Sequence, residues 1–415
     1  MQRISTNMPN DDMQYYARLR ESQLNNIQNQ IASQNRIQQL RDDPAAAAHA
    51  TRYASYLNRL HRYSENIEYA QNRHRESEVY MQETVNILQR VRELALQGAN
   101  GTYTQEDQRA MAAEVNQLLN QLVQTGNARG ADGTMLFAGD RTQSEPFRAI
   151  EGRIAGFDEP VITNVQYLGT IHQNQTEVAD GAFVPLNFVG NSVFWAEKQQ
   201  VYASADATNY VVQQDTAIRV DDADIQLRAG DNIYSIIAKV NDAGVAVRAR
   251  LDPVSSSLVM ETTSAHQLWL EDAEDGSVLR DLGILSDGTD RPPGNIASSA
   301  RTFGGSMFDM MISLRDQLAG GEVIDIGGRG VAGISTALDN VLGRLGTLGS
   351  LDERLQLAYE RTETDIPVIT ARYSNEVDVD MTQAITELKM LEYTHRAALG
   401  AAARVIQPTL LDFLR

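Results

Sequence analysis

The feature that most constrains this chain is the spacing of its apolar residues near both ends, where they recur every three or four positions. Leu24, Ile27 and Ile31 follow this spacing, and a longer series continues from residue 53 to residue 95. Such spacing places side chains on one face of an α-helix. The first 140 residues are therefore predicted to be almost entirely helical, with a helix far longer than the average of about 12 residues.

Local signals predict where these helices begin and end. Asp43 followed by Pro44 is typical of a helix start, because aspartate caps the first turn and proline fits its first position. Gly98 is a favourable residue for the end of that helix. Thr104 and Asp107 are spaced to cap the next helix, whose inner face is predicted to carry Met111, Val115, Leu118 and Leu122.

The same spacing returns near the C-terminus, over residues 338–359 and again over residues 381–405. Ile366-Pro367 between them predicts a break or a kink, because proline cannot donate a helical hydrogen bond. A helix this long needs helical partners along its length. The helix predicted at residues 107–128 is one candidate partner, and the opposite chain end supplies more. The two ends are therefore predicted to form a long antiparallel helical rod.

The middle of the chain, residues 141–300, is richer in Gly, Asp, Thr and Val and in short alternating runs. Strands are predicted at residues 225–228, 246–251 and 258–261, with a short helix at residues 233–241. The fold class is therefore mainly α with an inserted β-rich α+β domain. The predicted segments are 1–43 and 367–415 (terminal polymerisation helices), 44–140 and 301–366 (the two halves of the rod) and 141–300 (the inserted domain).

Charge excludes one class of partner. Residues 141–300 contain 11 basic and 23 acidic residues, a balance of −12, within a chain of net charge −19. Nucleic-acid phosphates would be repelled by this field, so no nucleic-acid partner is expected. No apolar run is long enough to span a bilayer, and the polar first ten residues do not resemble a signal peptide. We expect no membrane insertion and, if the protein is exported, no cleavable signal.

Residue patterns typical of catalysis or metal binding are missing from the sequence. The six histidines include no HExxH motif, and there is no cysteine to act as nucleophile or ligand. His74, on the helical stripe, is interpreted as a core residue. Residues 221–224 are interpreted as a solvated acidic turn, and residues 327–330 as a flexible connection, because the calcium-loop and phosphate-loop patterns are incomplete. We expect no enzyme, cofactor or metal.

The apolar residues of the terminal segments are too few to offset the cost of ordering those segments alone. They are therefore predicted to become ordered only against neighbouring molecules. The assembly interface that this predicts comprises Leu24, Ile27, Ile31, Ile37, Ile385, Leu388, Leu391, Leu399, Val405, Leu410, Phe413 and Leu414.

Short motifs at both ends resemble the bacterial flagellin superfamily. They are residues 3–8, 30–33 with 36–37, 42–47 and 88–95 near the N-terminus, and residues 378–381, 384–388 and 397–399 near the C-terminus. The resemblance covers residues 1–140 and 306–415. Residues 231–251 are similar to a small α+β repeat of that superfamily, within a module of about residues 215–285.

Two segments resemble the hook–filament junction branch of the superfamily rather than filament flagellin. They are Pro44-Ala45-Ala46-Ala47 and the ending at residues 405–414, and residues 167–194 add a weaker similarity. The resemblance implies a structural subunit at the hook–filament junction that joins hook to filament and templates flagellin assembly. It implies a homo-oligomeric ring in contact with a hook-side junction protein and flagellin, and a cytoplasmic export chaperone. The alternatives are a filament flagellin and a non-flagellar ligand-binding protein on a helical stalk.

Overall fold

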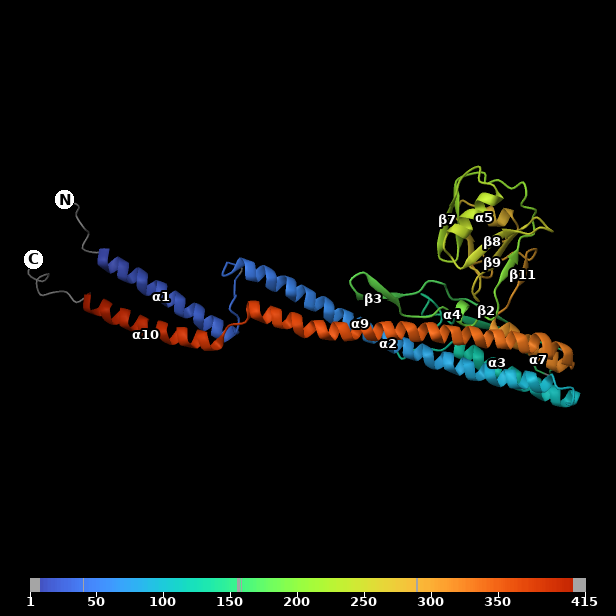
Figure 1. Ribbon diagram of the computed structural model, residues 1–415, viewed down its shortest axis with the longest axis horizontal. Coiled ribbons are helices and arrows are strands. Elements are labelled where there is room, and N and C mark those ends of the chain that lie inside the picture. Colours follow the sequence, from blue (N-terminus) through green and yellow to red (C-terminus); the bar gives the residue numbers. More distant parts are fainter. Residues whose placement is uncertain (1–7, 40, 155–156, 158, 289, 406–415) are drawn as a thin grey trace, which may run out of the picture. The chain divides into compact units, whose positions relative to one another are not determined.

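The computed structural model describes residues 8–39, 41–154, 157, 159–288 and 290–405 (Figure 1). The chain divides into two compact units. One unit combines the two chain ends, up to Glu65 and from Tyr359, and the other runs from Asn66 to Ala358. Long helices near both ends and small antiparallel sheets between them confirm the predicted fold class. Among the described helices, none combines the length and apolarity needed to cross a bilayer.

The unit formed by the chain ends is helical. It contains α1 (Met8–Ser33), the first part of α2 (Pro44–Gly98), the last part of α9 (Val331–Val377) and α10 (Met381–Val405). Helices α1 and α10 lie side by side and run in opposite directions (Figure 1). Apolar packing in this unit centres on Leu60, Tyr63 and Ile369.

Helix α2 begins and ends where the sequence predicts. Its first residue is Pro44, and the Asp43 carboxylate accepts a hydrogen bond from the backbone N–H of Ala46 at 3.0 Å. This satisfies a donor that the first turn of a helix leaves without an intrahelical partner. The helix ends at Gly98 after 55 residues.

Helix α9 corrects one prediction. It continues through Pro367 to Val377, so the helix is not broken at Ile366-Pro367. A proline inside a helix removes one hydrogen bond, and packing of the neighbouring residues can hold the helix despite that loss. Here Ile366 and Ile369 both contact the cluster around Leu60.

In the second unit, α3 (Gln105–Gly126) and α7 (Met307–Gly320) pack against each other. Thr104 and Asp107 form the predicted capping box at the start of α3. Met111, Val115 and Leu122 are buried as predicted, but Leu119 occupies the inner position assigned to Leu118, which is half-buried. These residues share one large core with α2, α7 and α9.

The glycine-rich segment before α9 is helical, which corrects the predicted flexible connection. After the short α8 (Val323–Asp325), Ile326–Gly330 forms one π-helical turn, η1, that leads directly into α9. Ile326 is fully buried in the core of this unit. Burial of this side chain explains why a glycine-rich segment adopts a fixed helical path.

The first part of the predicted inserted domain packs with the helices. It comprises two hairpins and a short helix: β1 (Phe147–Gly152), β2 (Val161–Tyr167), β3 (Gln175–Ala179), β4 (Ala182–Pro185) and α4 (Gly190–Val193). Phe147, Phe194 and Phe308 lie within ring contact of one another at centroid distances of 5.0–5.8 Å. They belong to the same core as the helices.

A separate core begins only at Val201 and extends to Leu285. It lies between two antiparallel sheets, ordered β10-β6-β7 and β11-β5-β9-β8. The elements are β5 (Gln200–Tyr202), β6 (Thr216–Val220), β7 (Ala223–Leu227), α5 (Ile233–Asp242), β8 (Val247–Leu251), β9 (Leu258–Thr262), β10 (Leu270–Asp272), α6 (Val278–Asp281) and β11 (Arg301–Phe303). The three predicted strands and the predicted helix are β7, β8, β9 and α5.

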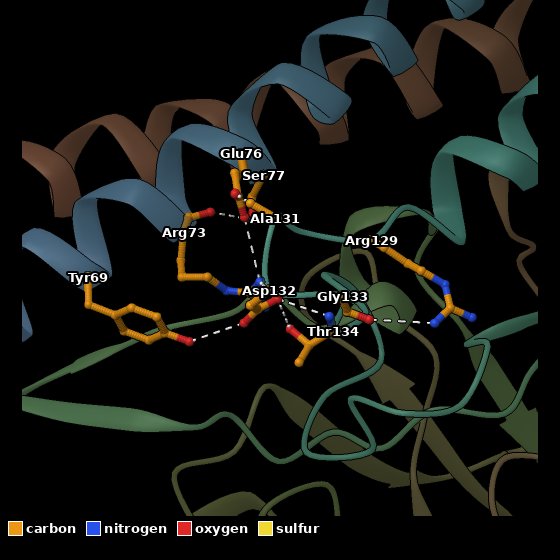
Figure 2. A network of polar contacts seen from close by, with 9 residues as sticks. All are labelled: Tyr69, Arg73, Glu76, Ser77, Arg129, Ala131, Asp132, Gly133 and Thr134. Carbon is orange, nitrogen blue, oxygen red and sulfur yellow. Dashed lines mark hydrogen bonds and ion pairs between the residues drawn. The ribbon is translucent and has the colours of Figure 1, made fainter.

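A polar network fixes the loop after α3 against α2 (Figure 2). Arg73, whose side chain is only 7% exposed, lies 3.1 Å from the Asp132 carboxylate. Tyr69 and Thr134 both donate hydrogen bonds to the same carboxylate. Burial raises the pKa of Asp132, but the hydrogen bonds from Thr134 and the charge of Arg73 outweigh it and leave the pKa below its ordinary value.

Candidate assembly interface

The α1–α10 pair has almost no buried side chains of its own. None of the α1 side chains that the structure describes is buried. In the described part of α10, Ala384 alone is buried. A helix in a globular protein usually buries an apolar stripe. The two helices therefore contact each other through half-buried side chains and do not enclose a buried core between them in the part that the structure describes.

Most of the predicted interface residues in α1 and α10 that the structure describes are partly buried. Five of the predicted residues in these helices are half-buried, namely Leu24, Ile27, Ile31, Leu388 and Leu391. Ile37, in the segment between α1 and α2, is also half-buried. Ile385 and Leu399 are exposed. Val405 ends α10 with its side chain outside the described part, and Leu410, Phe413 and Leu414 lie outside the described residues.

Larger apolar side chains project from the same pair. One of them, Met381, begins the stripe predicted over residues 381–405. The others were missed by the sequence prediction: Tyr15, Tyr16, Leu19, Met390, which is 68% exposed, and Tyr393, which is 76% exposed. The rings of Tyr15 and Tyr16 contact each other edge to face at 5.6 Å. The missed residues could have been identified as large apolar residues that lie outside the predicted stripes. Exposed apolar side chains in this number are typical of an interaction surface.

A groove of about 420 Å³ runs between α1 and α10. Ile27 and Leu391 line it together with Met390, and Arg20 and Glu387 bring one charge of each sign. The groove thus places apolar surface beside charged groups, a combination found in protein interfaces with an apolar centre and a polar rim.

The connection between α1 and α2 is joined to the connection between α9 and α10. The backbone N–H of Arg36 donates to the carbonyl of Val377 at 2.7 Å, and the N–H of Val379 donates to the carbonyl of Gln34 at 3.0 Å. Asn35 and Asp378 form the antiparallel bridge between these bonds. The bonds hold the ends of α1 and α10 in register.

Side chains add further contacts between the α1–α2 connection and the α9–α10 connection. Arg36 donates to the carbonyl of Glu376 at 2.8 Å and lies 3.2 Å from the Asp43 carboxylate. The Ala46 N–H, followed by Arg36, lowers the pKa of Asp43. His49 lies 3.3 Å from Glu376. Hydrogen bonds and ion pairs therefore hold these two connections together.

The histidine and aspartate residues that were examined as candidate catalytic or metal-binding groups make ordinary packing and hydrogen-bond contacts. His74 is buried, and its Nε2 lies 2.7 Å from the carbonyl oxygen of Pro185, as expected of a core residue. Residues 221 and 222 form a turn in which Asp222 is exposed, and Asp224 just after it is exposed too, as predicted for a solvated acidic turn. Asp221 differs, because its carboxylate accepts a hydrogen bond from the backbone N–H of Trp269 and lies 3.0 Å from His266 Nε2. Within the described part of the chain, no group of three or more His, Asp and Glu side chains could hold a metal ion.

Comparison with known proteins finds a family model that matches the N-terminal part of the chain. Residues 4–142 match the model of the bacterial flagellin N-terminal helical region. Flagellin FlaB1 of Treponema pallidum is 33% identical over 122 residues, which are 29% of this chain and 43% of that protein. A Salmonella muenchen flagellin is 26% identical over 257 residues, 59% of this chain and 47% of that protein. The N-terminal helical region of this chain is therefore similar to that of bacterial flagellins.

The chain spans less than half the length of these two relatives. A 30.7 kDa flagellar filament core protein of Treponema maltophilum is 24% identical over 57% of this chain and 79% of that protein. Among solved structures, flagellar hook associated protein-3 of Legionella pneumophila has a TM-score of 0.46 and 16% identity, covering 78% of this chain and 97% of that one. A putative flagellar hook-associated protein of Vibrio parahaemolyticus has a TM-score of 0.47 and 13% identity, covering 81% and 100%.

Proposed function

We propose that this chain is a member of the flagellin family and a structural subunit of the bacterial flagellum, located at the hook–filament junction. It would form a homo-oligomeric ring that contacts a hook-side junction protein on one side and flagellin on the other. The observation that carries the proposal is the α1–α10 pair, which exposes Tyr15, Tyr393 and other apolar side chains while almost none of its own are buried. The role is structural, and we propose no catalytic residue.

In this proposal residues 1–43 and 367–415 are the polymerisation segments. Neighbouring copies would cover Met390 and Tyr393, which are among the most exposed apolar residues of α10. Covering one large apolar side chain stabilises an interface by about 1.5–3 kcal/mol. Several such residues per copy supply the free energy that orders both terminal segments. A cytoplasmic export chaperone would bind the C-terminal segment before assembly.

Sequence similarity supports the junction rather than the filament. Pro44-Ala45-Ala46-Ala47 and the ending at residues 405–414 resemble the junction branch. The competing function is filament flagellin, which is favoured by the curated relatives that bear that name. The two functions differ in the number of copies per flagellum.

Removing residues 1–40 and 375–415 tests whether the ends carry assembly. The remaining chain keeps the large core of the second unit, so a folded monomer is expected. Cells expressing it should make hooks without attached filaments. Filaments that stay attached to the hooks would rule out the proposed role of these segments.

Deleting the gene distinguishes junction from filament. Loss of a junction subunit leaves flagellin synthesis intact, so hooks should form while flagellin accumulates in the medium. Loss of a filament flagellin would instead remove the main filament band from purified flagella. Electron microscopy of labelled flagella should place the protein only at the hook's distal end.

Hydrogen exchange tests whether the ends are ordered by neighbours. In the dilute full-length monomer, amides of α1 and α10 should exchange much faster than those of α3, because their side chains are hardly buried. In the assembled state they should become protected. Strong protection of α1 and α10 in the monomer would contradict the mechanism.

A further inference from the structure

The turn between α2 and α3 contains the only Asn-Gly pair of the sequence, Asn100-Gly101. Helix α2 ends at Gly98, and the capping box of α3 begins at Thr104. Residues 100–104 are all exposed. The turn lies in the second unit, outside the terminal helices that carry the proposed function. An exposed Asn-Gly pair places a side-chain amide beside a backbone nitrogen that no Cβ atom shields.

Both ends of this turn are fixed by packing or by hydrogen bonds. A Cβ atom at Gly98 would lie 2.4 Å from the Leu318 side chain, so the end of α2 packs closely against α7. At the other end, the side chains of Thr104 and Asp107 each accept a hydrogen bond from the backbone N–H of the other residue. The fold therefore holds Asn100 in a defined turn and leaves it open to water.

The two groups that would react with each other make no competing hydrogen bonds. Within the described part of the chain, neither the side-chain amide of Asn100 nor the backbone N–H of Gly101 is hydrogen-bonded. A Cβ atom at Gly101 would meet nothing within 4 Å. Neither a hydrogen bond nor a neighbouring atom therefore keeps the Gly101 nitrogen away from the Asn100 side chain.

The backbone carbonyl of Asn100 accepts hydrogen bonds from the N–H groups of Thr102 at 2.6 Å and Tyr103 at 3.4 Å. The first of these bonds closes a γ-turn around Gly101. This carbonyl belongs to the same peptide group as the Gly101 nitrogen, and hydrogen bonds polarise the groups that they join. Electron density drawn toward the oxygen makes the Gly101 N–H easier to deprotonate. The turn therefore favours the deprotonated nitrogen, which is the nucleophilic form.

We propose that Asn100 is a site of spontaneous deamidation in the folded chain, with the turn itself supplying the nucleophile. The deprotonated Gly101 nitrogen forms a bond to Cγ of Asn100, and the bond between Cγ and Nδ2 breaks. Nδ2 leaves as ammonia with the proton that Gly101 lost, and a cyclic succinimide remains. Water then opens the ring. Breaking the new bond to Cγ gives aspartate, and breaking the bond to the backbone carbonyl carbon gives isoaspartate.

Each product changes the turn and leaves the start of α3 in place. Aspartate adds one negative charge at an exposed position, and isoaspartate also lengthens the main chain by a methylene group. Thr104 and Asp107 keep their own hydrogen bonds, because neither residue takes part in the ring. Negative charge ahead of a helix also interacts favourably with the helix dipole. We therefore expect the modified chain to stay folded and to carry a new charge between α2 and α3.

Mass spectrometry of the folded, full-length chain tests the proposal. Trypsin cuts after Arg92 and Arg109, and Asn100 is the only asparagine in the peptide 93–109. After incubation in mildly alkaline buffer, this peptide should gain the mass that separates an acid from an amide. An aliquot digested before incubation gives the background. Labelling by protein-isoaspartate methyltransferase identifies the isoaspartate product. Conversion should be slower in mildly acidic buffer, because attack needs the deprotonated nitrogen.

Two controls show whether the change depends on this pair. A methyl group at Gly101 has free space and meets no left-handed backbone, so Gly101→Ala should keep the turn. Its Cβ should slow conversion by about tenfold, because it hinders the approach of the nitrogen. Asn191, which precedes Ser192, is buried and donates to the carbonyl of Gln267 at 3.2 Å, so it should keep its amide in the same samples.

A synthetic peptide of residues 93–109 gives the behaviour of the same sequence without the fold. Conversion of Asn100 in the folded chain while Asn191 keeps its amide supports the proposal. If the free peptide is converted and Asn100 in the folded chain keeps its amide over the same time, the fold protects the turn and the proposal is overturned. Equal rates in the wild-type chain and in Gly101→Ala would overturn the role of the Gly101 nitrogen.

Discussion

The guanidinium of Arg315 donates a hydrogen bond to the backbone carbonyl of Ile162 at 2.6 Å, although the two residues lie 153 positions apart. Arg315 belongs to α7 and is fully buried, and Ile162 belongs to β2. The same group donates to Asn116 of α3 at 3.1 Å and to the neighbouring Asp316 at 2.9 Å. One side chain thus joins two helices and a hairpin.

Arg315→Met should destabilise the second unit by about 2–4 kcal/mol, because it leaves a buried carbonyl without its donor and removes charge-assisted bonds. Urea unfolding followed by circular dichroism measures the loss. Arg329→Met, at a side chain 86% exposed in η1, is the control and should change stability by less than about 0.5 kcal/mol. Equal unfolding midpoints for the two variants would show that the Arg315 contacts are not stabilising.

Nothing in the spacing of residues indicated this role for Arg315. Arginine is usually a surface residue, and its partners are supplied by segments distant in sequence. By contrast, the starts of α2 and α3 were predicted from Asp43 and Thr104, because helix caps depend on residues three positions apart. Helix starts could therefore be predicted from nearby residues, while contacts between segments distant in sequence could not.

Pro367→Ala should stabilise the unit formed by the chain ends. Proline inside α9 cannot donate the helical hydrogen bond and disfavours helix relative to alanine by about 3 kcal/mol. Since the helix has adapted to proline, a gain of about 1–3 kcal/mol is expected on thermal or urea unfolding. Val368→Ala, at the adjacent exposed position, should have little effect. A loss of stability on Pro367→Ala would mean that proline is required for the local path of the helix.

Proline also shows where sequence reasoning overstates a signal. Ile366-Pro367 predicted a break or a kink, yet packing of Ile366 and Ile369 against the Leu60 cluster keeps the helix continuous. The glycine-rich η1 was misjudged for the same reason, because the buried Ile326 fixes it. Intrinsic propensity is a weak guide where tertiary packing opposes it.

Stability of the second unit should fall below pH 6.5 through His74. Burial lowers the pKa of His74 below its ordinary value of 6.5, although the Pro185 carbonyl acts in the opposite direction. The folded protein therefore favours the neutral ring, and the unfolded protein binds more protons between the two pKa values. The contribution is complete above the unfolded pKa and is lost as the pH falls towards the folded pKa.

The measurement compares the free energy of unfolding at about pH 7.5 and pH 5.5. Wild type should lose more stability than His74→Gln over this interval, because only the wild-type chain takes up an additional proton at this position on unfolding. His61→Gln, on the exposed side of α2, should behave as wild type. An NMR titration in which His74 protonates at or above pH 6.5 would contradict the sign of the effect.

Tyr393→Glu should abolish assembly without destabilising the monomer. The side chain is 76% exposed on α10, so the isolated chain should change by less than about 0.5 kcal/mol. Burying a carboxylate in the proposed interface should weaken it by roughly 30- to 100-fold, as expected for a buried aromatic anchor. Electron microscopy should show hooks without filaments. Tyr234→Glu, at a side chain 62% exposed on α5, is the control and should leave filaments attached.

The candidate interface was only partly readable from the sequence. The stripe containing Leu24, Ile27 and Ile31 identified the seam between α1 and α10, where all three are half-buried. It could not identify Tyr15 or Tyr393, because periodicity marks the face that a helix turns toward its partner within the chain. The face that each helix exposes to other molecules can be identified only once its partner within the chain is known.

The bridge between Asn35 and Asp378 has a consequence for the order of folding. A chain that emerges N-terminus first completes α1 long before residue 378 is available. During that interval α1 has no antiparallel partner, and Leu24, Ile27 and Ile31, which are half-buried in the closed pair, remain accessible to any other apolar surface. Closure of the pair is therefore the last event of chain emergence, and its rate depends on a loop of more than 300 residues.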